Sequence, residues 1–291
     1  MPKKYKGMNQ DNGGSAREAS PSDGAFSGAG GDRPLAVVTG ASSGIGYELA
    51  RVCAMHGYDL VVAASSSKIK ESAQRLSKLG VDVRAVQTDL ATERGVDTLY
   101  NAAKSLNRPV EVLCANAGRG LGHAFLDQDW QEIKRVIDTN VTGTAYLLQK
   151  FARDMVSRGA GRILITGSIA GVIPGTYQAV YNATKAFVDN FSYALRHEIG
   201  DKGVTVTCLM PGGTATEFFE KAGMMDTPIG QAEKDDALDV ALVGFGALMS
   251  NKGSVVYGLK NKLQVAAARV APQGWMAEAH RMQAQPSGEQ R

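Results

Sequence analysis

Apolar runs that alternate with helical stretches are the feature that most constrains how this chain can fold. Seven short runs rich in β-branched residues are continuous in apolar character, which is typical of strands covered on both faces. They begin at Leu35, Asp59, Val83, Glu111, Gly161, Val204 and Ser254. Helical periodicity predicts helices over 45–56, 68–79, 93–106, 129–157, 178–199 and 234–249. This alternation predicts an α/β fold: a doubly wound, parallel seven-stranded sheet with helices on both faces.

The two ends of the chain differ in composition from its middle. Residues 1–33 are rich in Gly, Ser and Asp and nearly free of large apolar side chains, so we expect a disordered leader. Residues 34–270 carry the strand and helix pattern and are expected to form a single domain. Residues 271–291 are expected to form a C-terminal helix and a polar tail.

Composition and charge exclude several function classes. The chain has 291 residues, 44% hydrophobic and 21% charged, and its net charge of +3 comes from interspersed residues, so we expect no nucleic-acid partner. No apolar stretch reaches the roughly 18 residues that span a membrane, and no secretory signal is expected. The three cysteines indicate buried, reduced thiols in a cytoplasmic protein. With the four histidines they form no metal-binding pattern, so we expect no metal.

A glycine-rich turn follows the first strand. In "VVTGASSGIGYELA", the glycines Gly40, Gly44 and Gly46 enclose Ser42, Ser43 and Ile45. Glycines between a strand and a helix let the backbone approach a pyrophosphate, whose charge is held by free amides and the positive end of the helix. The turn therefore predicts a dinucleotide site, although a purely structural turn is a second interpretation.

A tyrosine and a lysine four residues apart stand in "YNATK", at Tyr181 and Lys185. Four residues separate neighbours on one helix face, so the pair is either chemistry or packing. A phenol has a pKa of about 10, and a lysine ammonium one helical turn away favours the phenolate, which would lower that pKa. Tyr177 is a competing phenol, but it has no lysine at the same spacing.

Four motifs together resemble one known family. "TGASSGIG", "NAG" at 116–118, Ser168 and "YNATK" thirteen residues later are similar in order and spacing to short-chain dehydrogenases/reductases, over about residues 34–260. The resemblance implies a Rossmann-type fold and a catalytic group of Asn140, Ser168, Tyr181 and Lys185. In it, Tyr181 is the general acid or base and Lys185 lowers its pKa and binds the nicotinamide ribose. Ser168 binds the substrate oxygen, and Asn140 holds a water behind the lysine.

The end of the second strand is expected to select the cofactor. Asp59 lies at the expected count from Gly40, but it precedes the strand core and so belongs at the edge away from the ligand. The carboxyl end reads "AASSSK" and has no carboxylate. Ser65, Ser66 and Lys68 could donate to a 2′-phosphate, so NADP(H) is favoured and NAD(H) is possible. The alternative is that the serines cap the next helix.

The resemblance implies further cofactor contacts at the ends of three strands. Asp89 would accept from the adenine amino group, unless it caps the helix near Thr92. Small residues would let the ribose lie close to the backbone after the fourth strand, and "PGGTATEFF" resembles a nicotinamide-binding element. The implied residues are Asp89, Leu90, Asn116, Ala117, Gly118, Pro211, Gly212 and Thr216.

Substrate and assembly are less defined by the sequence. Phe218, Phe219, Met224 and Met225 follow the sixth strand and suggest a lipophilic pocket for a small carbonyl or alcohol substrate, although the phenylalanines could equally be core. Gly120, Gly122 and the loop 169–178 are expected to form its other walls. The resemblance also implies a homodimer or homotetramer built on the helices 129–157 and 178–199. The rival to an enzyme is a non-catalytic, NADP-binding regulatory protein on the same fold.

Overall fold

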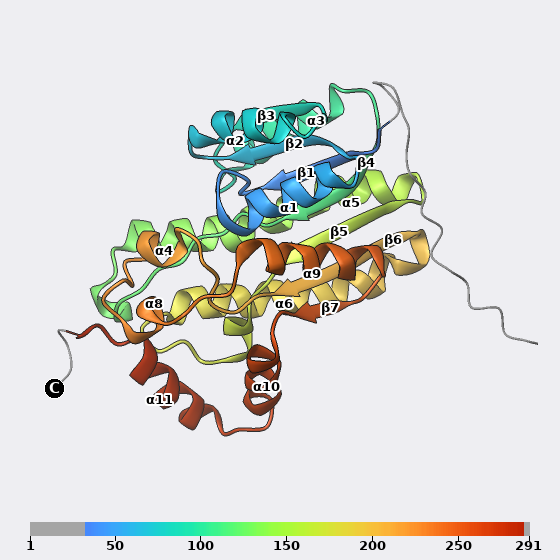
Figure 1. Cartoon of the computed structure of the whole chain (residues 1–291). Coiled ribbons are helices and arrows are strands. Elements are labelled where there is room, and N and C mark those ends of the chain that lie inside the picture. The colour runs from blue at the N-terminus through green and yellow to red at the C-terminus, as the bar shows by residue number, and fades with distance from the viewer. Residues whose placement is uncertain (1–32, 288–291) are drawn as a thin grey trace, which may run out of the picture.

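The computed structural model of the chain describes residues 33–287. Its centre is a seven-stranded parallel sheet in the order β3-β2-β1-β4-β5-β6-β7, seen in Figure 1. The strands are β1 (Leu35–Thr39), β2 (Asp59–Ala64), β3 (Val83–Gln87), β4 (Val110–Ala115), β5 (Gly161–Thr166), β6 (Val204–Met210) and β7 (Ser254–Val256). The predicted doubly wound parallel sheet is confirmed, with all seven strands at the predicted places.

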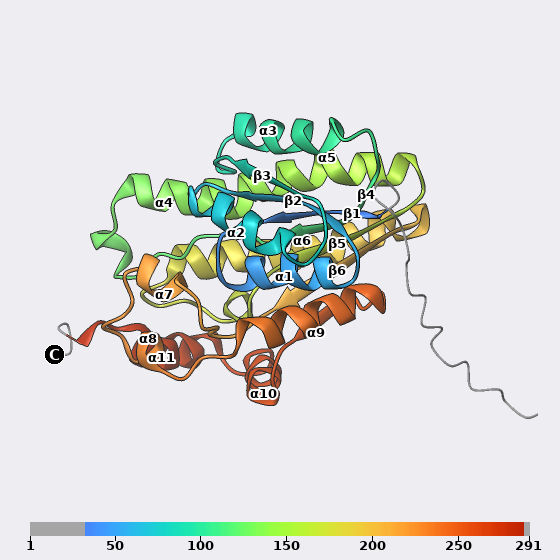
Figure 2. The same ribbon diagram turned by 45° about the horizontal axis from the view of Figure 1, so that its top comes forward.

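Helices cover both faces of the sheet, as Figure 2 shows. On one face lie α1 (Gly44–Met55), α2 (Lys68–Ser77) and α9 (Ala237–Met249). On the other lie α3 (Glu93–Lys104), α5 (Thr144–Ser157) and α6 (Ala179–Ile199). Alternate strand residues feed the two cores: Leu35 and Val37 pack on one side, and Ala36 and Val38 on the other. The strands are continuous in apolar character because both of their faces are buried.

The edge strand β3 departs from that pattern. The prediction that every strand is covered on both faces is wrong here, because Arg84, Ala85 and Gln87 are exposed. As the last strand of the sheet, β3 has a neighbour only on its β2 side, and the helices cover it less completely.

The predicted helix over 129–157 is continuous but not uniform. It consists of α4 (Trp130–Ile137), a π-helical segment (Asp138–Gly143) and α5. Short π-helical segments inside α-helices are frequent at functional sites. This one contains Asn140, so the irregular turn falls on a predicted catalytic residue.

Beyond the sixth strand, four helices form a layer over the carboxyl edge of the sheet. Two are the short α7 (Phe218–Lys221) and α8 (Pro228–Gln231), and two are α10 (Leu259–Ala268) and α11 (Gln273–Ala284). α11 packs against α8. Within residues 33–287, no helix is both long and apolar enough to cross a bilayer. The predicted leader lies outside the described residues except for Arg33, and so do residues 288–291 of the predicted tail.

Candidate active site

A cavity of about 1370 Å³ lies along the carboxyl edge of the sheet, where open parallel sheets bind ligands. Its volume exceeds the roughly 300–1,000 Å³ of ordinary small-molecule sites, so it has room for a dinucleotide and a substrate together. The predicted site residues that line it are Gly40, Ser42, Ser43, Gly44, Ile45, Gly46, Ser65, Ser66, Asp89, Leu90, Asn116, Ala117, Gly118, Ser168, Tyr181, Lys185, Pro211, Gly212 and Thr216. Of the predicted site residues, Asn140 alone is not part of this lining.

The glycine turn packs against the segment after β6. Gly44 has a φ of +56°, in the left-handed region that side chains disfavour. A Cβ atom at Gly44 would lie 2.6 Å from Cγ2 of Thr216, so a larger residue would displace the neighbouring loop. Ser43 precedes α1 in an extended conformation and makes no side-chain cap. The free amides of this helix start therefore face the cavity, and a pyrophosphate fits there.

Side-chain hydrogen bonds join the ends of neighbouring strands in the middle of the carboxyl edge of the sheet. Thr39 Oγ1 accepts from the backbone N–H groups of Asn116, at 2.9 Å, and Ala117, at 3.0 Å. Asn116 donates from Nδ2 to the Thr39 carbonyl at 3.1 Å, and its Oδ1 accepts from Thr166 Oγ1 at 3.0 Å. The ends of β1, β4 and β5 are thus joined by side chains at the point where a cofactor ribose would lie.

At the end of β2, the structure places all three predicted side chains, Ser65, Ser66 and Lys68, in the cavity lining. Ser65 and Ser66 line the cavity, and Ser66 Oγ also accepts from the Lys68 N–H at 3.2 Å. Lys68 itself is paired with Glu217, from the segment after β6, at 2.8 Å. A third serine, Ser67, occupies the N-cap position of α2 without a side-chain cap bond. Asp59 lies at the opposite end of β2, where it is buried and paired with Arg108 at 2.8 Å. The prediction that Asp59 belongs at the edge away from the ligand is confirmed.

Asp89 lines the cavity at the end of β3. Its Oδ1 accepts from the Ala91 N–H at 3.1 Å, and its Oδ2 lies 3.5 Å from Arg135. The N-cap of α3 is Thr92, whose side chain accepts from the Gly95 N–H. The alternative in which Asp89 caps that helix is therefore wrong.

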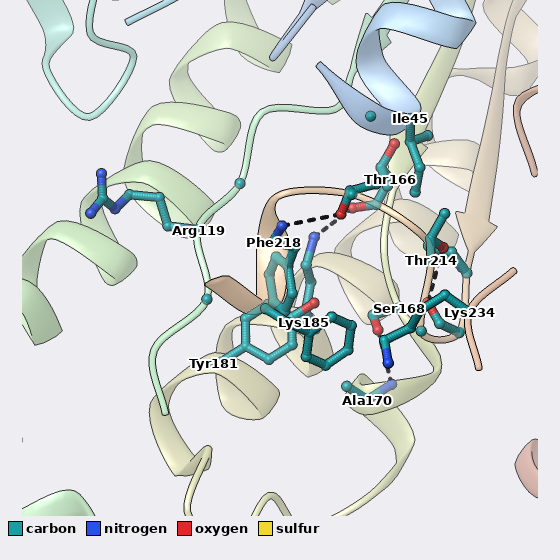
Figure 3. Close-up of a pocket in the computed structure, with 18 of the residues that line it drawn as sticks. Ile45, Arg119, Thr166, Ser168, Ala170, Tyr181, Lys185, Thr214, Phe218 and Lys234 are labelled. Carbon is teal, nitrogen blue, oxygen red and sulfur yellow. Dashed lines mark hydrogen bonds between the residues drawn. The ribbon is translucent and has the colours of Figure 1, made fainter. Parts of the chain in front are cut away.

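Tyr181 and Ser168 meet in the cavity from different elements. Tyr181 lies on the first turn of α6, and Ser168 follows β5 as the N-cap of a 3-10 turn, where its Oγ accepts from the Ala170 N–H at 3.0 Å. A hydrogen bond from Ser168 lowers the pKa of the Tyr181 phenol. Figure 3 shows the Tyr181 ring beside Phe218, and their ring centroids are 5.1 Å apart. A substrate carbonyl placed here would meet both hydroxyl groups.

Lys185 and Asn140 lie behind this pair. Lys185 is buried and donates from Nζ to the Thr166 carbonyl at 2.8 Å. Asn140 accepts from the Arg119 N–H at 2.8 Å and donates to Thr184 Oγ1 at 2.9 Å. A Cβ atom at Gly118 would lie 3.4 Å from Asn140 Oδ1 and 3.5 Å from Lys185 Nζ, so the two side chains are close neighbours. The π-helical turn thus places Asn140 on the side of Gly118 where Lys185 also lies, outside the cavity lining.

The direction of the Tyr181 pKa differs from the prediction. Burial raises the pKa of Tyr181 to about 12, and the negative field of Asp189 adds to this increase. Burial also lowers the pKa of Lys185. Lys185 Nζ is directed to Thr166 and lies 6.0 Å from the Tyr181 ring centroid. The protein groups alone therefore favour the neutral phenol, because burial raises the pKa of Tyr181 more than the hydrogen bond with Ser168 lowers it.

Asp189 is a site residue that the sequence interpretation missed. Its Oδ1 accepts from the Ser168 N–H at 3.2 Å, and its Oδ2 has no hydrogen-bond partner among the described residues. A Cβ atom at Gly167 would lie 1.8 Å from Oδ1, so glycine lets this loop reach the carboxylate. Burial raises the pKa of Asp189 to about 6. The sequence signal that could have identified Asp189 is its position two helical turns after Tyr181.

Neutralising Asp189 has a predictable effect on pH dependence. The groups that face its carboxylate are Lys185 and Tyr181 on α6, the Cys208 thiol on β6, and the N–H of Ser168. The charge of Asp189 raises the pKa of both Tyr181 and Lys185. In Asp189→Asn we expect the pKa of Tyr181 to fall, so the rising limb of kcat/KM for alcohol oxidation moves to lower pH.

The pH profiles of wild type, Asp189→Asn and Asp189→Ala check this expectation. The alanine variant also loses the acceptor for Ser168, and its kcat should fall about tenfold, as for one lost hydrogen bond. Glu198→Gln removes an exposed carboxylate from the same helix and is the matched control. A limb that stays in place in Asp189→Asn would contradict the assignment.

The remaining walls come from elements that no motif marks. Phe218 and Phe219 both line the cavity, and Phe219 is also buried among apolar side chains. Neither Met224 nor Met225 lines the cavity. Gly120 and the loop carrying Ile169, Ala170 and Ile173 do. The lining residues that the sequence interpretation did not name include Arg119, Lys234, Asp235, Gln283, Met276 and His280. Met276, His280 and Gln283 lie on α11, which the sequence interpretation placed outside the domain.

Fold and site together define a class of protein: an oxidoreductase on a dinucleotide-binding fold. The family model for short chain dehydrogenases matches residues 34–226. The chain belongs to this family.

Relatives agree with this membership. The chain is 31% identical over 213 residues to the 3-oxoacyl-acyl-carrier-protein reductase FabG of Staphylococcus aureus, covering 72% of this chain and 84% of that protein. It resembles a solved short-chain dehydrogenase from Sphingobium yanoikuyae in complex with NADPH, with a TM-score of 0.74, 30% identity, and coverage of 84% and 96%. A family member from Burkholderia phymatum in complex with NAD gives a TM-score of 0.73 at 25% identity, covering 81% and 92%.

A third structural neighbour has a named substrate class. The bulky-bulky ketone specific alcohol dehydrogenase of Comamonas testosteroni has a TM-score of 0.69 and 27% identity, with coverage of 84% of this chain and 94% of that protein. A nicotinamide cofactor is therefore supported by these neighbours, one bound to NADPH and another to NAD.

Proposed function

We propose that this protein transfers a hydride between NADP(H) and a carbonyl or secondary alcohol, with Tyr181 as the general acid in reduction and the base in oxidation. The observation that carries the proposal is the convergence of Tyr181 and Ser168 in one cavity, with Lys185 behind them and the glycine turn along the same edge. This arrangement supplies a proton donor, a second donor for the substrate oxygen and a cradle for a dinucleotide.

The roles follow from the contacts of each side chain. The Tyr181 hydroxyl donates its proton to the substrate oxygen, and Ser168 Oγ donates a hydrogen bond to the same atom as negative charge develops there. Lys185 would hold the ribose hydroxyls and counter the charge left on Tyr181. Asn140 fixes the backbone of Arg119 and reaches Thr184, whose hydroxyl donates to the Tyr181 carbonyl at 2.7 Å. A bound reduced nicotinamide would supply the hydride.

The preference for NADP(H) is supported by Ser65 and Ser66 at the end of β2, where the "AASSSK" stretch itself has no carboxylate. Glu217 is the nearby carboxylate, and both Lys68 and Lys221 neutralise it, at 2.8 and 2.6 Å. We expect NADPH to bind about tenfold more tightly than NADH, because hydrogen bonds to a phosphate are worth more than neutral ones.

Fluorescence titration of both cofactors tests this preference. Replacing Ser65 and Ser66 together by alanine should weaken NADPH about tenfold and leave NADH within about twofold, as expected for lost bonds to a charged group. Ser67→Ala is the matched control, since that neighbouring serine makes no side-chain cap bond. Tighter binding of NADH by the unmodified protein would reverse the preference.

We infer that the substrate is lipophilic. Phe218, Phe219, Ile169 and Ile173 give the cavity apolar walls beside Tyr181. The resemblance to a dehydrogenase specific for bulky ketones agrees with this inference. A panel of aldehydes, ketones, sterols and sugar-like alcohols tests both class and function. Carbonyl-dependent oxidation of NADPH is expected for the apolar members, and its absence from the whole panel would favour the regulatory alternative.

Assembly and location complete the proposal. We propose a homodimer or homotetramer through α4, α5 and α6, where Phe187 and Phe191 stack with centroids 5.7 Å apart and Phe187 is exposed. All three cysteines are buried and free, which supports a reducing compartment such as the cytoplasm.

A further inference from the structure

Helix α10 presents an apolar stripe to solvent. Leu259 is 73% exposed, Leu263 62% and Val270 86%, and Ala266 between them is also exposed. These positions are four, three and four residues apart, so they share one side of the helix and of the turn that ends it. The opposite side is buried through Asn261, Val265 and Ala268. A helix that packs on one side normally presents polar side chains to solvent, whereas α10 presents these apolar ones.

Basic residues flank the stripe on both sides. At helical spacing, Lys262 and Arg269 lie along one edge and Lys260 along the other, and all three are exposed. No acidic residue occurs between positions 258 and 277. An apolar centre with cations along its borders is the pattern of a helix that lies in a bilayer interface.

A tryptophan extends the surface onto the next helix. Trp275, in the first turn of α11, is 75% exposed and follows Val270 by five residues. Figures 1 and 2 show α10, α11 and their connection at the side of the molecule away from β1, β2 and β3. Tryptophan favours the interface between water and lipid, since its ring has an apolar body and a polar N–H group. We name Leu259, Leu263, Ala266, Val270 and Trp275 the outer face.

The outer face lies next to the cavity. Leu259, Lys260 and Gln264 of α10 also line the cavity, and so do Met276 and His280 of α11. The outer face therefore borders the cavity, and Leu259 belongs to both. A surface that binds the outer face would lie beside this edge of the cavity.

We propose that the outer face docks the protein on the surface of a membrane that contains anionic lipids. The three cations complement negative headgroups, and the apolar stripe and Trp275 enter the boundary of the acyl chains. A second copy fits less well, because pairing this face with itself would oppose like charges with no carboxylate between 258 and 277 to compensate. The apolar pair Phe187 and Phe191, on α6, lies on another element.

Co-sedimentation of the full chain with vesicles tests this proposal. We expect binding to vesicles of phosphatidylcholine with phosphatidylglycerol, little binding to phosphatidylcholine alone, and loss of binding at high salt. Lys262→Gln with Arg269→Gln should reduce binding by about fivefold for each cation removed. Leu263→Asp with Val270→Asp should reduce it at least tenfold, because charge is placed in the apolar stripe. The matched control is Leu126→Asp, at a leucine that is 90% exposed outside these helices.

Each outcome decides the proposal. Neither pair of substitutions touches the cavity lining, so turnover of a water-soluble carbonyl and Tm should equal those of wild type. Failure of wild type to bind anionic vesicles overturns the proposal. An oligomer that Leu263→Asp with Val270→Asp converts to monomer, without vesicle binding by wild type, assigns the outer face to a second copy instead. Vesicle binding by a protein that reduces no carbonyl supports docking while contradicting the proposed activity.

Discussion

Replacing Tyr181 by phenylalanine is expected to reduce carbonyl-dependent NADPH oxidation by on the order of 10³-fold, within the usual range for a lost general acid. The variant keeps the ring that packs against Phe218 and removes only the hydroxyl group. Ser168 would remain to bind the substrate oxygen, but its hydroxyl group does not have the acidity needed to replace the phenol as proton donor. Steady-state oxidation of NADPH with an apolar ketone measures the loss.

Two controls separate chemistry from folding and binding. The Kd for NADPH should stay within about twofold, because the loss of one neutral hydroxyl removes little binding energy. Tyr177→Phe removes the competing phenol, which lies outside the cavity lining, and should leave turnover unchanged. Turnover by Tyr181→Phe at the wild-type rate would eliminate Tyr181 as the acid.

Replacing Lys185 by methionine is expected to lower kcat/KM by on the order of 10²–10³-fold and, unlike Tyr181→Phe, to weaken NADPH as well. The ammonium is buried and held on the Thr166 carbonyl, so its charge acts from a fixed place. Removing it would leave the phenolate of Tyr181 without a nearby cation and would delete a charge-assisted hydrogen bond to the ribose. The latter should raise the Kd for NADPH about tenfold.

The role of Lys185 is tested by measuring kcat/KM and the Kd for NADPH separately. Lys202→Met removes an exposed lysine after α6 and should change neither quantity. The double variant Tyr181→Phe with Lys185→Met should be little slower than the worse single variant, because residues that act as a unit are not additive. Full additivity of the two losses would mean that the lysine acts independently of the tyrosine.

The Tyr181 pKa gives these predictions a further consequence. Since burial raises it to about 12, the protein groups by themselves keep the phenol neutral near pH 7. A neutral phenol is the form needed to protonate a substrate in reduction. Oxidation needs the phenolate, so Lys185→Met should move the rise of kcat/KM for oxidation to higher pH, because a positive charge that favours the phenolate is removed.

Much of the fold and of the site could be predicted from local sequence patterns. Continuous apolar runs place the strands because both faces of the sheet are buried at its centre, and the two edge strands depart from that rule: β3 is largely exposed and β7 is only half-buried. The glycine turn and the "YNATK" spacing place residues that later share one cavity, because parallel strands end at the same edge. These features depend on neighbours in the chain, so a sequence can show them.

The sequence by itself therefore determined the class of fold, and it located the glycine turn and the side chains that we propose for cofactor binding and proton transfer. Only the tertiary structure decided their surroundings. Lys68 meets Glu217 across 149 residues, Asp189 reaches the N–H of Ser168 from another element, and α11 closes a cavity that no motif assigned to it. Burial and charge fields sum over all atoms near a group in space, so even the direction of the Tyr181 pKa depends on packing that periodicity and spacing do not contain.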